Sequence, residues 1–346
     1  MDQANEEFGV EFKWDRDLLS GYKYHFLDNR AKHPGFSSFF GCNTPEIGTI
    51  IREEKFDAVL LMGWNLFSYW QAAHACRLSG TPILVRGDSH LGTPRKLLKK
   101  TVKSIVYPWM FKRCDGCLYV GKLSREYYMH YGVSVNKLFF SPHSVDNDWL
   151  SRECREIDKT SLRREFGIDE NTTVVLFAGK LVDRKRPLDI IRALEVLGSD
   201  FLAVFVGAGE LAGQIKQTAR NMGVNCHVLG FKNQSEMPAM YVLADVLVLP
   251  SDGSETWGLV VNEAMACGVP VIASDAVGCV PDLIDVGLTG FSYPSADIAA
   301  LRNRLAEYKA SCGKRGFVDS LRAKIDSYSP VAASKGIVFA LESVKK

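Results

Sequence analysis

Short apolar runs recur along the chain, and polar stretches with helical spacing separate them. In the N-terminal half an aromatic-rich alternating run, residues 22–27, predicts a first strand. Four more runs predict buried strands at residues 56–62, 81–85, 116–120 and 138–141. Helical patterns lie between some of them, at residues 69–78 and 124–131. Strands that alternate with helices are typical of parallel βαβ units.

The same alternation returns after a charged helical connector, residues 152–166. Strands are predicted at residues 173–178, 202–206, 226–229, 246–249 and 270–273. Helices are predicted at residues 187–197, 211–222, 237–244, 297–305, 315–328 and 330–344, with another from about Gly258. The pattern predicts two α/β domains, residues 1–148 and 149–328. A last helix, residues 329–346, would pack back on the first domain.

Composition limits the classes of protein that this chain can be. With 346 residues it has the length of two domains, and a formal net charge of +2 gives no electrostatic argument for nucleic acid as a partner. No apolar run approaches the roughly 20 residues that span a bilayer. The polar, acidic start does not resemble a signal peptide, and the nine scattered cysteines suggest reduced thiols. We therefore expect a cytoplasmic protein.

The most informative stretch is residues 249–284. A strand ends at Leu249, a polar loop follows, and a helix begins near Gly258, with Glu255 and Glu263 on either side of its start. The first amides of a helix lack intrahelical acceptors, so those of Gly258 and Leu259 can bind an anion. Two carboxylates beside a phosphate are unfavourable unless each binds hydroxyls. The pattern therefore predicts a site for a nucleotide-diphosphate sugar.

Two further loops follow predicted strands. After residues 173–178 come Gly179 and four cations, Lys180, Arg184, Lys185 and Arg186. They are either a clamp for phosphates or a solvated loop. Cations are unfavourable at a helix N-terminus, which favours a bound anion. After residues 202–206 comes Gly207-x-Gly209, which is either a tight turn or a close approach to phosphate.

These residues together resemble the retaining glycosyltransferases of family 4. The resemblance rests on Gly179-Lys180-Leu181 with Lys185, on Gly207-x-Gly209, and on Glu255-x7-Glu263 within PSxxSETWGLVVNEAMAxGxPVIAS. It extends over about residues 22–344 and is densest at 173–290. It implies the GT-B fold, in which two Rossmann-like doubly wound domains face each other across a cleft. The N-terminal domain would bind the acceptor and the C-terminal domain the donor.

The resemblance also implies roles for matching residues. Glu255 would hold the hydroxyls of the donor sugar and Glu263 those of the ribose, while the amides of Gly258 and Leu259 bind the distal phosphate. The diphosphate leaving group would be neutralised by Lys180 and Lys185. The donor, a UDP-, GDP- or related sugar, would also contact Gly179, Gly207, Gly209, Thr256 and Phe231. No metal or other cofactor is expected.

The first domain matches less well. The family often has a histidine facing the donor sugar, and the resemblance places Asp88 there, with His90 two residues later and Arg86 before it. Asp88 or His90 would position the sugar or the acceptor. The alternative for His90 is a surface or capping histidine. Residues 142–146 correspond to the turn that crosses between domains, and we interpret them as mainly structural.

Residues 94–113 contain seven cations and no acidic residue, together with many apolar side chains. A basic amphipathic helix can lie on an anionic membrane, which would suit a lipid-linked acceptor at the inner face of the membrane. The alternative is an ordinary covering helix, kinked or ended by Pro108. The nearby Cys114 and Cys117 lack the second pair that a zinc site needs, so we expect them to pack in the core.

Related enzymes usually begin with an apolar strand, a glycine-bearing loop and a helix, which are not found before Tyr22. We therefore expect that a strand–helix–strand unit is missing and the first domain is truncated. Its loss would leave a gap in the sheet or bring residues 22–27 against 56–62.

The sequence predicts a retaining, metal-independent glycosyltransferase for a saccharide or lipid-linked acceptor in cell-surface glycan assembly. One alternative is an inactive nucleotide-sugar-binding protein or partner subunit. A phosphorylase or epimerase on the same two-domain plan is another.

Overall fold

The computed structural model describes residues 3–5, 10–12, 15–17, 19–94, 97–311 and 316–345. The chain forms two compact units. The C-terminal unit comprises Met1–Leu18, Gly92–Pro94 and Ser144–Pro330. The N-terminal unit comprises Leu19–Leu91, Arg95–His143 and Val331–Lys346, so the last helix belongs to the same unit as the early strands.

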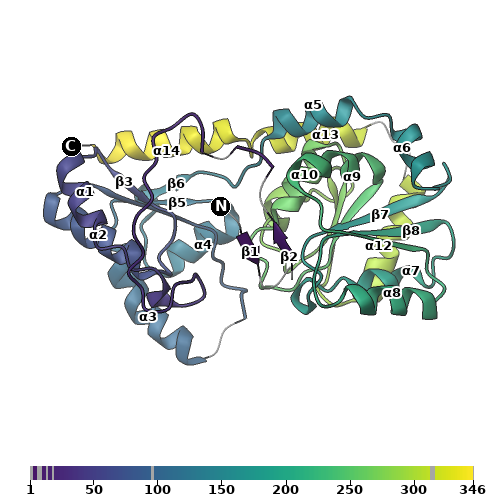
Figure 1. Cartoon of the computed structure of the whole chain (residues 1–346), viewed down its shortest axis with the longest axis horizontal. Helices are drawn as coiled ribbons and strands as arrows, with labels where there is room; N and C mark the ends of the chain where they lie inside the picture. The colour runs from purple at the N-terminus through teal and green to yellow at the C-terminus, as the bar shows by residue number, and fades with distance from the viewer. Residues whose placement is uncertain are drawn as a thin grey trace. The chain divides into compact units, whose positions relative to one another are not determined.

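The sheet of the N-terminal unit has four parallel strands. Their order is β3 (Val59–Leu61), β4 (Ile83–Gly87), β5 (Gly116–Tyr119) and β6 (Leu138–Phe140). Helices α1 (Ile47–Glu54), α2 (Phe67–Ser79), α3 (Leu97–Phe111) and α4 (Lys122–His130) pack on one face. The long helix α14 (Pro330–Val344) covers the other face, where Ala340 packs with Leu84, Leu118 and Phe139 (Figure 1).

The sheet of the C-terminal unit has six parallel strands. Their order is β12 (Gly290–Tyr293), β11 (Val271–Ser274), β10 (Val246–Leu249), β7 (Thr173–Ala178), β8 (Phe201–Val206) and β9 (Cys226–Gly230). One face carries α7 (Leu188–Leu194), α8 (Ala212–Asn221) and α12 (Ile298–Ser311). The opposite face carries α5 (Asn147–Arg155), α6 (Lys159–Glu165), α9 (Met237–Leu243), α10 (Leu259–Ala266) and α13 (Gly316–Asp326) (Figure 1).

Helices on both faces explain the composition of the central strands. Every position of β7, β8 and β10 is buried, as continuous apolar runs in a doubly covered parallel sheet require. The strand order reverses at β7, because the chain continues to β8 on one side while β10 returns on the other. In open α/β sheets, ligands bind beyond the carboxyl ends of the strands at such a reversal. The fold therefore directs attention to the loops after β7, β8 and β10.

The remaining elements are short. The strands β1 (Gln3–Asn5) and β2 (Val10–Phe12) pair antiparallel. The other short elements are α11 (Val280–Leu283) and the 3-10 helices η1 (Phe39–Gly41), η2 (Val135–Lys137), η3 (Asp183–Lys185) and η4 (Gln234–Glu236). No helix in the described ranges is both long and apolar enough to cross a membrane.

The predicted strand at residues 22–27 is wrong. These residues belong to no sheet, and the side chains of Tyr22, Tyr24 and Phe26 are more than half exposed. Their rings pack edge to face on one another, with centroids 6.4 and 5.3 Å apart, so the alternation of aromatics reflects stacking along an extended chain rather than a core-facing strand. The expected gap is also wrong, because the described strands pair without interruption from β3 to β6. Sequence reasoning also missed α1 and the edge strand β12.

A half-buried carboxylate at the amino end of β10 joins three elements. The Asp245 carboxylate accepts hydrogen bonds from Lys159 Nζ at 2.9 Å, Arg163 Nη2 at 2.5 Å and the Val174 amide at 2.8 Å. Arg163 is only 7% exposed. Because removing the carboxylate leaves the buried Arg163 charge uncompensated, this cluster should matter to stability.

Asp245→Asn should therefore lower the free energy of unfolding by about 3–5 kcal/mol. The matched control is Asp200→Asn, whose carboxylate pairs with Lys309 but is 69% exposed. That substitution should cost under about 1 kcal/mol. Urea unfolding followed by circular dichroism measures both. Equal losses in the two variants would contradict this account of Asp245.

Candidate functional site

The loops after β7 and β8 touch through their backbones. A Cβ atom on Gly207 would lie 1.9 Å from the Gly179 carbonyl oxygen, and one on Gly209 would lie 2.5 Å from that of Leu181. Both glycines have positive φ, +136° and +152°. The Leu181 amide donates to the Ala208 carbonyl at 2.9 Å, which joins the loops. Only glycine fits at these positions, and a glycine loop lets a ligand approach the backbone closely.

The loop after β9 continues this arrangement. The Gly207 amide donates to the Gly230 carbonyl at 2.7 Å. Phe231, predicted as a donor contact, is the next residue after Gly230 and therefore lies beside the glycine loops. The carboxyl ends of three adjacent strands thus form one continuous backbone surface.

The four predicted cations separate into different environments. Lys185 ends the 3-10 helix η3 and forms an ion pair with Glu255, and each side chain is 14% exposed. Arg186 is committed to its own segment, because its Nε donates to Asp189 Oδ2 at 2.7 Å. The Arg184 carbonyl accepts from the Asp252 amide at 3.0 Å, which ties the cationic loop to the loop after β10. Lys185 is therefore paired directly with the glutamate motif.

Glu255 is held by its backbone and its side chain. The Ser251 hydroxyl donates to Glu255 Oε2 at 3.2 Å, and the Glu255 carbonyl accepts from the Gly278 amide at 3.1 Å. A Cβ atom on Gly278 would lie 1.8 Å from the carbonyl oxygen of the next residue, Thr256. This part of the loop is therefore packed tightly against a second backbone, which fixes the position of the carboxylate.

Gly258 lets α10 begin where it does. It is the N-cap with φ +94°, and a Cβ atom there would lie 2.8 Å from Leu249 Cδ2. The indole N–H of buried Trp257 donates to Asn262 Oδ1 at 2.8 Å and braces the first turn. Leu259, the first helical residue, is 41% exposed, so this end of the helix is open to solvent. Its dipole and its first amides favour an anion.

Glu263 lies one turn further into α10 and has a partner that sequence reasoning missed. The Tyr241 hydroxyl on α9 donates to Glu263 Oε2 at 2.5 Å. Burial raises the pKa of Glu263, although the hydrogen bond from Tyr241 acts in the opposite direction. Burial, followed by the charge of Glu263, holds the pKa of the Tyr241 phenol well above its usual value. The tyrosine therefore remains a donor at all working pH values.

The N-terminal unit places Arg86, Asp88 and His90 just after β4 or at its end. Arg86 joins its strand to the end of β6, because its guanidinium donates to Pro142 O at 2.8 Å and to Ser141 O at 3.3 Å. Burial lowers the pKa of this guanidinium. His90 is 3% exposed, so the alternative of a surface histidine is excluded.

Asp88 has an unexpected neighbour. Its Oδ2 lies 3.5 Å from Nε2 of His143, in the turn that we interpreted as mainly structural. The two come from the loops after β4 and β6. His143, in the loop after β6, therefore faces Asp88, in the loop after β4.

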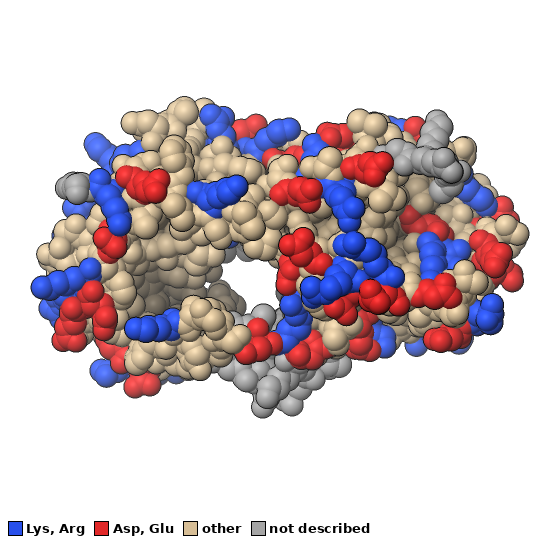
Figure 2. All heavy atoms as spheres, turned by 90° about the horizontal axis from the view of Figure 1, so that it is seen from above, with Lys and Arg blue, Asp and Glu red and all other residues tan. Residues whose placement is uncertain are grey.

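Other predicted features also have clear positions. Residues 94–113 contain α3, and Pro108 lies inside this helix. The two cysteines with CxxC spacing are buried, Cys114 at 6% and Cys117 at 0% exposure. Over the part of the chain that the structure describes, no cluster of three or more histidines, cysteines or carboxylates could hold a metal ion. On the face in Figure 2, basic and acidic side chains are interspersed.

The comparisons with known proteins agree with this geometry. Residues 158–316 match the family model of the glycosyl transferases group 1. A D-inositol 3-phosphate glycosyltransferase of Pseudarthrobacter chlorophenolicus is 30% identical over 220 residues, 60% of this chain and 51% of that protein. An N-acetyl-alpha-D-glucosaminyl L-malate synthase of Bacillus anthracis is 33% identical over 136 residues, 39% of this chain and 35% of that protein. The chain thus spans about half or less of the length of these relatives.

Solved structures show the same fold at low identity. The structure of Anabaena HepE in complex with UDP has a TM-score of 0.73 at 19% identity and covers 87% of this chain and 83% of its own. A glycosyltransferase from Rickettsia africae has a TM-score of 0.71 at 18% identity, with 87% and 80% covered.

The raised pKa of Glu263 gives a test of its environment. The folded-state pKa lies above the ordinary value of 4.5, so between the two values the native state binds more protons than the unfolded state. Stability should fall as pH rises through this window, by about 1.4 kcal/mol for each unit of raised pKa.

Urea unfolding of the protein without nucleotide, over a pH series, measures this effect. Glu263→Gln should lack this component, so the wild type should lose stability relative to it as pH rises. Tyr241→Phe removes the hydrogen-bond donor that lowers the pKa of Glu263, so the pH range over which stability falls should extend to higher pH. Identical pH dependence in the wild type and Glu263→Gln would show that the carboxylate is not perturbed.

The family match, the close loop contacts and the neighbouring folds agree on one assignment. The chain has the GT-B fold, and its residues 158–316 are similar to the glycosyl transferases group 1.

Proposed function

We propose that this protein is a retaining glycosyltransferase that moves a sugar from a nucleotide-diphosphate donor to a saccharide or lipid-linked acceptor in cell-surface glycan biosynthesis. The observation that carries the proposal is the partly buried Lys185–Glu255 pair beside the start of α10. It combines a cation for phosphate with a carboxylate for hydroxyls at the reversal of strand order.

The chemistry follows from where charge develops. When the bond between the anomeric carbon and the phosphate oxygen breaks, negative charge grows on the leaving diphosphate. Lys185, Lys180 and the first amides of α10, from Gly258 and Leu259, would stabilise that charge. These groups supply positive charge from the protein itself, so we propose a reaction that needs no metal. The acceptor hydroxyl then attacks on the face that the leaving group vacates; this retaining outcome rests on the resemblance to family 4.

The carboxylates would orient the two ends of the donor. Once the phosphate engages Lys185, the Glu255 carboxylate can accept hydrogen bonds from sugar hydroxyls. The resting ion pair keeps both groups in place and limits the reorganisation on binding. Glu263, held by Tyr241, would accept from the ribose hydroxyls. In the N-terminal unit, we propose that Asp88, with His143 at 3.5 Å, or the buried His90 positions the transferred sugar or the acceptor.

Similar proteins suggest where to look for the donor. Solved structures of Anabaena HepE contain UDP and UDP-glucose. One relative is a lipopolysaccharide 1,2-N-acetylglucosaminetransferase of Salmonella typhimurium, 29% identical over 159 residues. We therefore propose a UDP-sugar as the first donor to test, before GDP-, ADP- and dTDP-sugars. A cytoplasmic site of action is part of the same proposal, since such donors are made there.

A substitution of Lys185 tests whether this residue stabilises the leaving diphosphate. Lys185→Met should lower kcat/KM for sugar transfer by about 10²–10³-fold, because one preorganised positive group is lost from the transition state. The control is Lys309→Met on α12. In the wild type Lys309 pairs with the exposed Asp200, and the variant should transfer sugar at the wild-type rate. Transfer is measured as nucleotide release with the donor that gives the largest thermal shift.

Full activity of Lys185→Met would contradict the assignment. Tight donor binding by the wild type without transfer to any acceptor would instead favour the alternative of an inactive nucleotide-sugar-binding protein. Transfer from a sugar phosphate rather than from a nucleotide sugar would indicate a phosphorylase.

Helix α3 supports a peripheral membrane contact as part of the proposal. Its exposed side chains include Val102, Ile105 and Trp109, at 52%, 70% and 51% exposure, and they recur at helical spacing. Trp109 stacks on Trp70 at 6.2 Å, and the Arg113 guanidinium lies 3.7 Å from the Trp109 ring centroid. Apolar groups among cations suit the boundary of an anionic bilayer.

Liposome flotation tests this contact. The protein should float with vesicles that contain phosphatidylglycerol and not with pure phosphatidylcholine, and Ile105→Glu should reduce the bound fraction several-fold. The control Val196→Glu changes a residue that is 64% exposed in the C-terminal unit, and it should bind as the wild type does. Absence of flotation with both vesicle types would refute the contact.

A further inference from the structure

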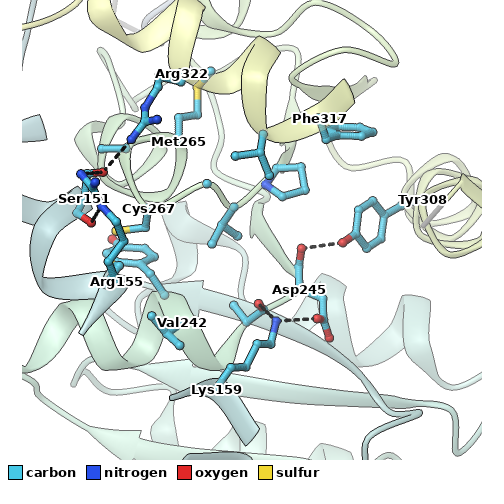
Figure 3. A pocket seen from close by; sticks show the side chains of 18 of the residues that line it. Ser151, Arg155, Lys159, Val242, Asp245, Met265, Cys267, Tyr308, Phe317 and Arg322 are labelled. Carbon is cyan, nitrogen blue, oxygen red and sulfur yellow. Dashed lines mark hydrogen bonds and ion pairs between the residues drawn. The ribbon is translucent and has the colours of Figure 1, made fainter. Parts of the chain in front are cut away.

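A cavity of the C-terminal unit lies at the opposite edge of its sheet from the glycine loops. It has a volume of about 580 Å³ and is bounded by residues that directly precede β10 and β11 and by the ends of surrounding helices (Figure 3). Its walls come from α5, α9, α10, α12 and α13. The mouth is lined by Ser151, Arg155 and Arg322, and both guanidinium groups donate to the Ser151 hydroxyl, at 3.1 and 3.3 Å.

Two cysteines far apart in the sequence meet in the wall of this cavity. Cys154 is on the last turn of α5, and Cys267 follows the last residue of α10. Both line the cavity and both are partly exposed. The Cys154 thiol donates to the Pro238 carbonyl at 3.7 Å, and helices α5 and α10 pack against each other. Both thiols therefore face the same space, which small molecules can enter, and each shifts the pKa of the other.

The environment distinguishes the two thiols. The hydrogen bond from Cys267 lowers the pKa of Cys154, while the same contact, burial and the charges of Cys154 and Glu263 raise the pKa of Cys267. A thiolate is the nucleophile in thiol oxidation, so Cys154 is the group that reacts first. Cys267 stays protonated beside it, so its proton can leave with the displaced hydroxyl when the Cys267 sulfur attacks.

We propose that Cys154 and Cys267 form an oxidisable dithiol, a modification site at which a peroxide closes a disulfide between α5 and α10. The Cys154 sulfur attacks one peroxide oxygen, the O–O bond breaks, and a sulfenic acid and one water result. The Cys267 sulfur then attacks the Cys154 sulfur and displaces the hydroxyl as a second water. Two thiols lose two protons and two electrons, and the peroxide is reduced to two waters.

The disulfide has a consequence at the other end of α10. A disulfide holds two sulfur atoms about 2.05 Å apart, much closer than two hydrogen-bonded thiols, so the end of α10 must shift toward α5. The Cys267 amide donates to the Glu263 carbonyl at 3.1 Å, and Tyr241, which holds the Glu263 carboxylate, lines the same cavity. Oxidation should therefore weaken nucleotide binding. This consequence rests on the proposed function, whereas the disulfide does not.

The chain contains a comparison pair. Cys114 and Cys117 are close in sequence, but both are buried, and the pKa of Cys117 is raised well above its usual value. A peroxide has no access to a sulfur atom that is 0% exposed, so this pair should not react in the folded protein.

Peptide mass spectrometry of the full chain, treated with hydrogen peroxide and digested without reductant, tests the site. We expect a cross-linked pair of peptides that contains Cys154 and Cys267, lost on treatment with dithiothreitol, and no bond between Cys114 and Cys117. Cys154→Ser and Cys267→Ser should each abolish the cross-link. Cys312→Ser should retain the cross-link. Cys312 directly follows Ser311, which lines the cavity, and is outside the described residues.

The site is overturned if Cys154 oxidises only to sulfinic acid, or if it cross-links to another cysteine. The consequence is tested separately by calorimetry with UDP, for which oxidised wild type should bind about fivefold more weakly than reduced wild type, and Cys154→Ser should not respond to peroxide. Equal affinity of both forms would overturn the consequence for the donor site. Failure of the reduced protein to bind any nucleotide would count against the proposed function, while the cross-link result would still decide the dithiol.

Discussion

Direct backbone contact between the loops after β7 and β8 is the constraint on which the proposed donor site depends. Gly207 and Gly209 leave no space for a Cβ atom against the carbonyls of Gly179 and Leu181. This contact follows from the parallel sheet, whose neighbouring strands end at the same edge. The third loop, after β10, is tied to the first through the Arg184 carbonyl and the Lys185–Glu255 pair. The site is therefore made of backbone that the sheet positions, with few charged side chains placed on it.

Helix α10 links the two edges of the C-terminal sheet. Its start, at Gly258, faces the proposed phosphate site, and its end, at Cys267, forms part of the cavity that Cys154 also lines. Glu263 lies between them and is held by Tyr241. Helix α10 therefore connects the proposed phosphate site at its start with the proposed dithiol at its end. Asp245 and Lys159 line the same cavity, and their cluster with Arg163 anchors β10 and α6, so the surroundings of the thiols are held firmly.

The sequence predicted the repeating α/β pattern well because the buried strands are continuous apolar runs. The predicted bounds of β7, β10 and α14 are those of the structure. It failed where exposure cannot be inferred from composition: Tyr22, Tyr24 and Phe26 alternate like a strand but face solvent. The short edge strand β12, which begins with Gly290, offered too weak a pattern. The sequence motifs identified Lys185, Glu255 and Glu263. They did not identify Tyr241 as the partner of Glu263, Ser251 as a partner of Glu255, or the ion pair between Lys185 and Glu255. Contacts between residues distant in sequence cannot be inferred from local spacing.

The central claim is that Lys185 and the start of α10 hold the distal phosphate of a nucleotide diphosphate. Calorimetry with UDP and UMP on the reduced protein tests it most directly, because the two ligands differ only in that phosphate. The account predicts that UDP binds at least about tenfold more tightly than UMP, as one charge-assisted interaction of roughly 1.4 kcal/mol requires, and that Lys185→Met removes most of the difference. Equal affinities of UDP and UMP in the wild type would contradict it.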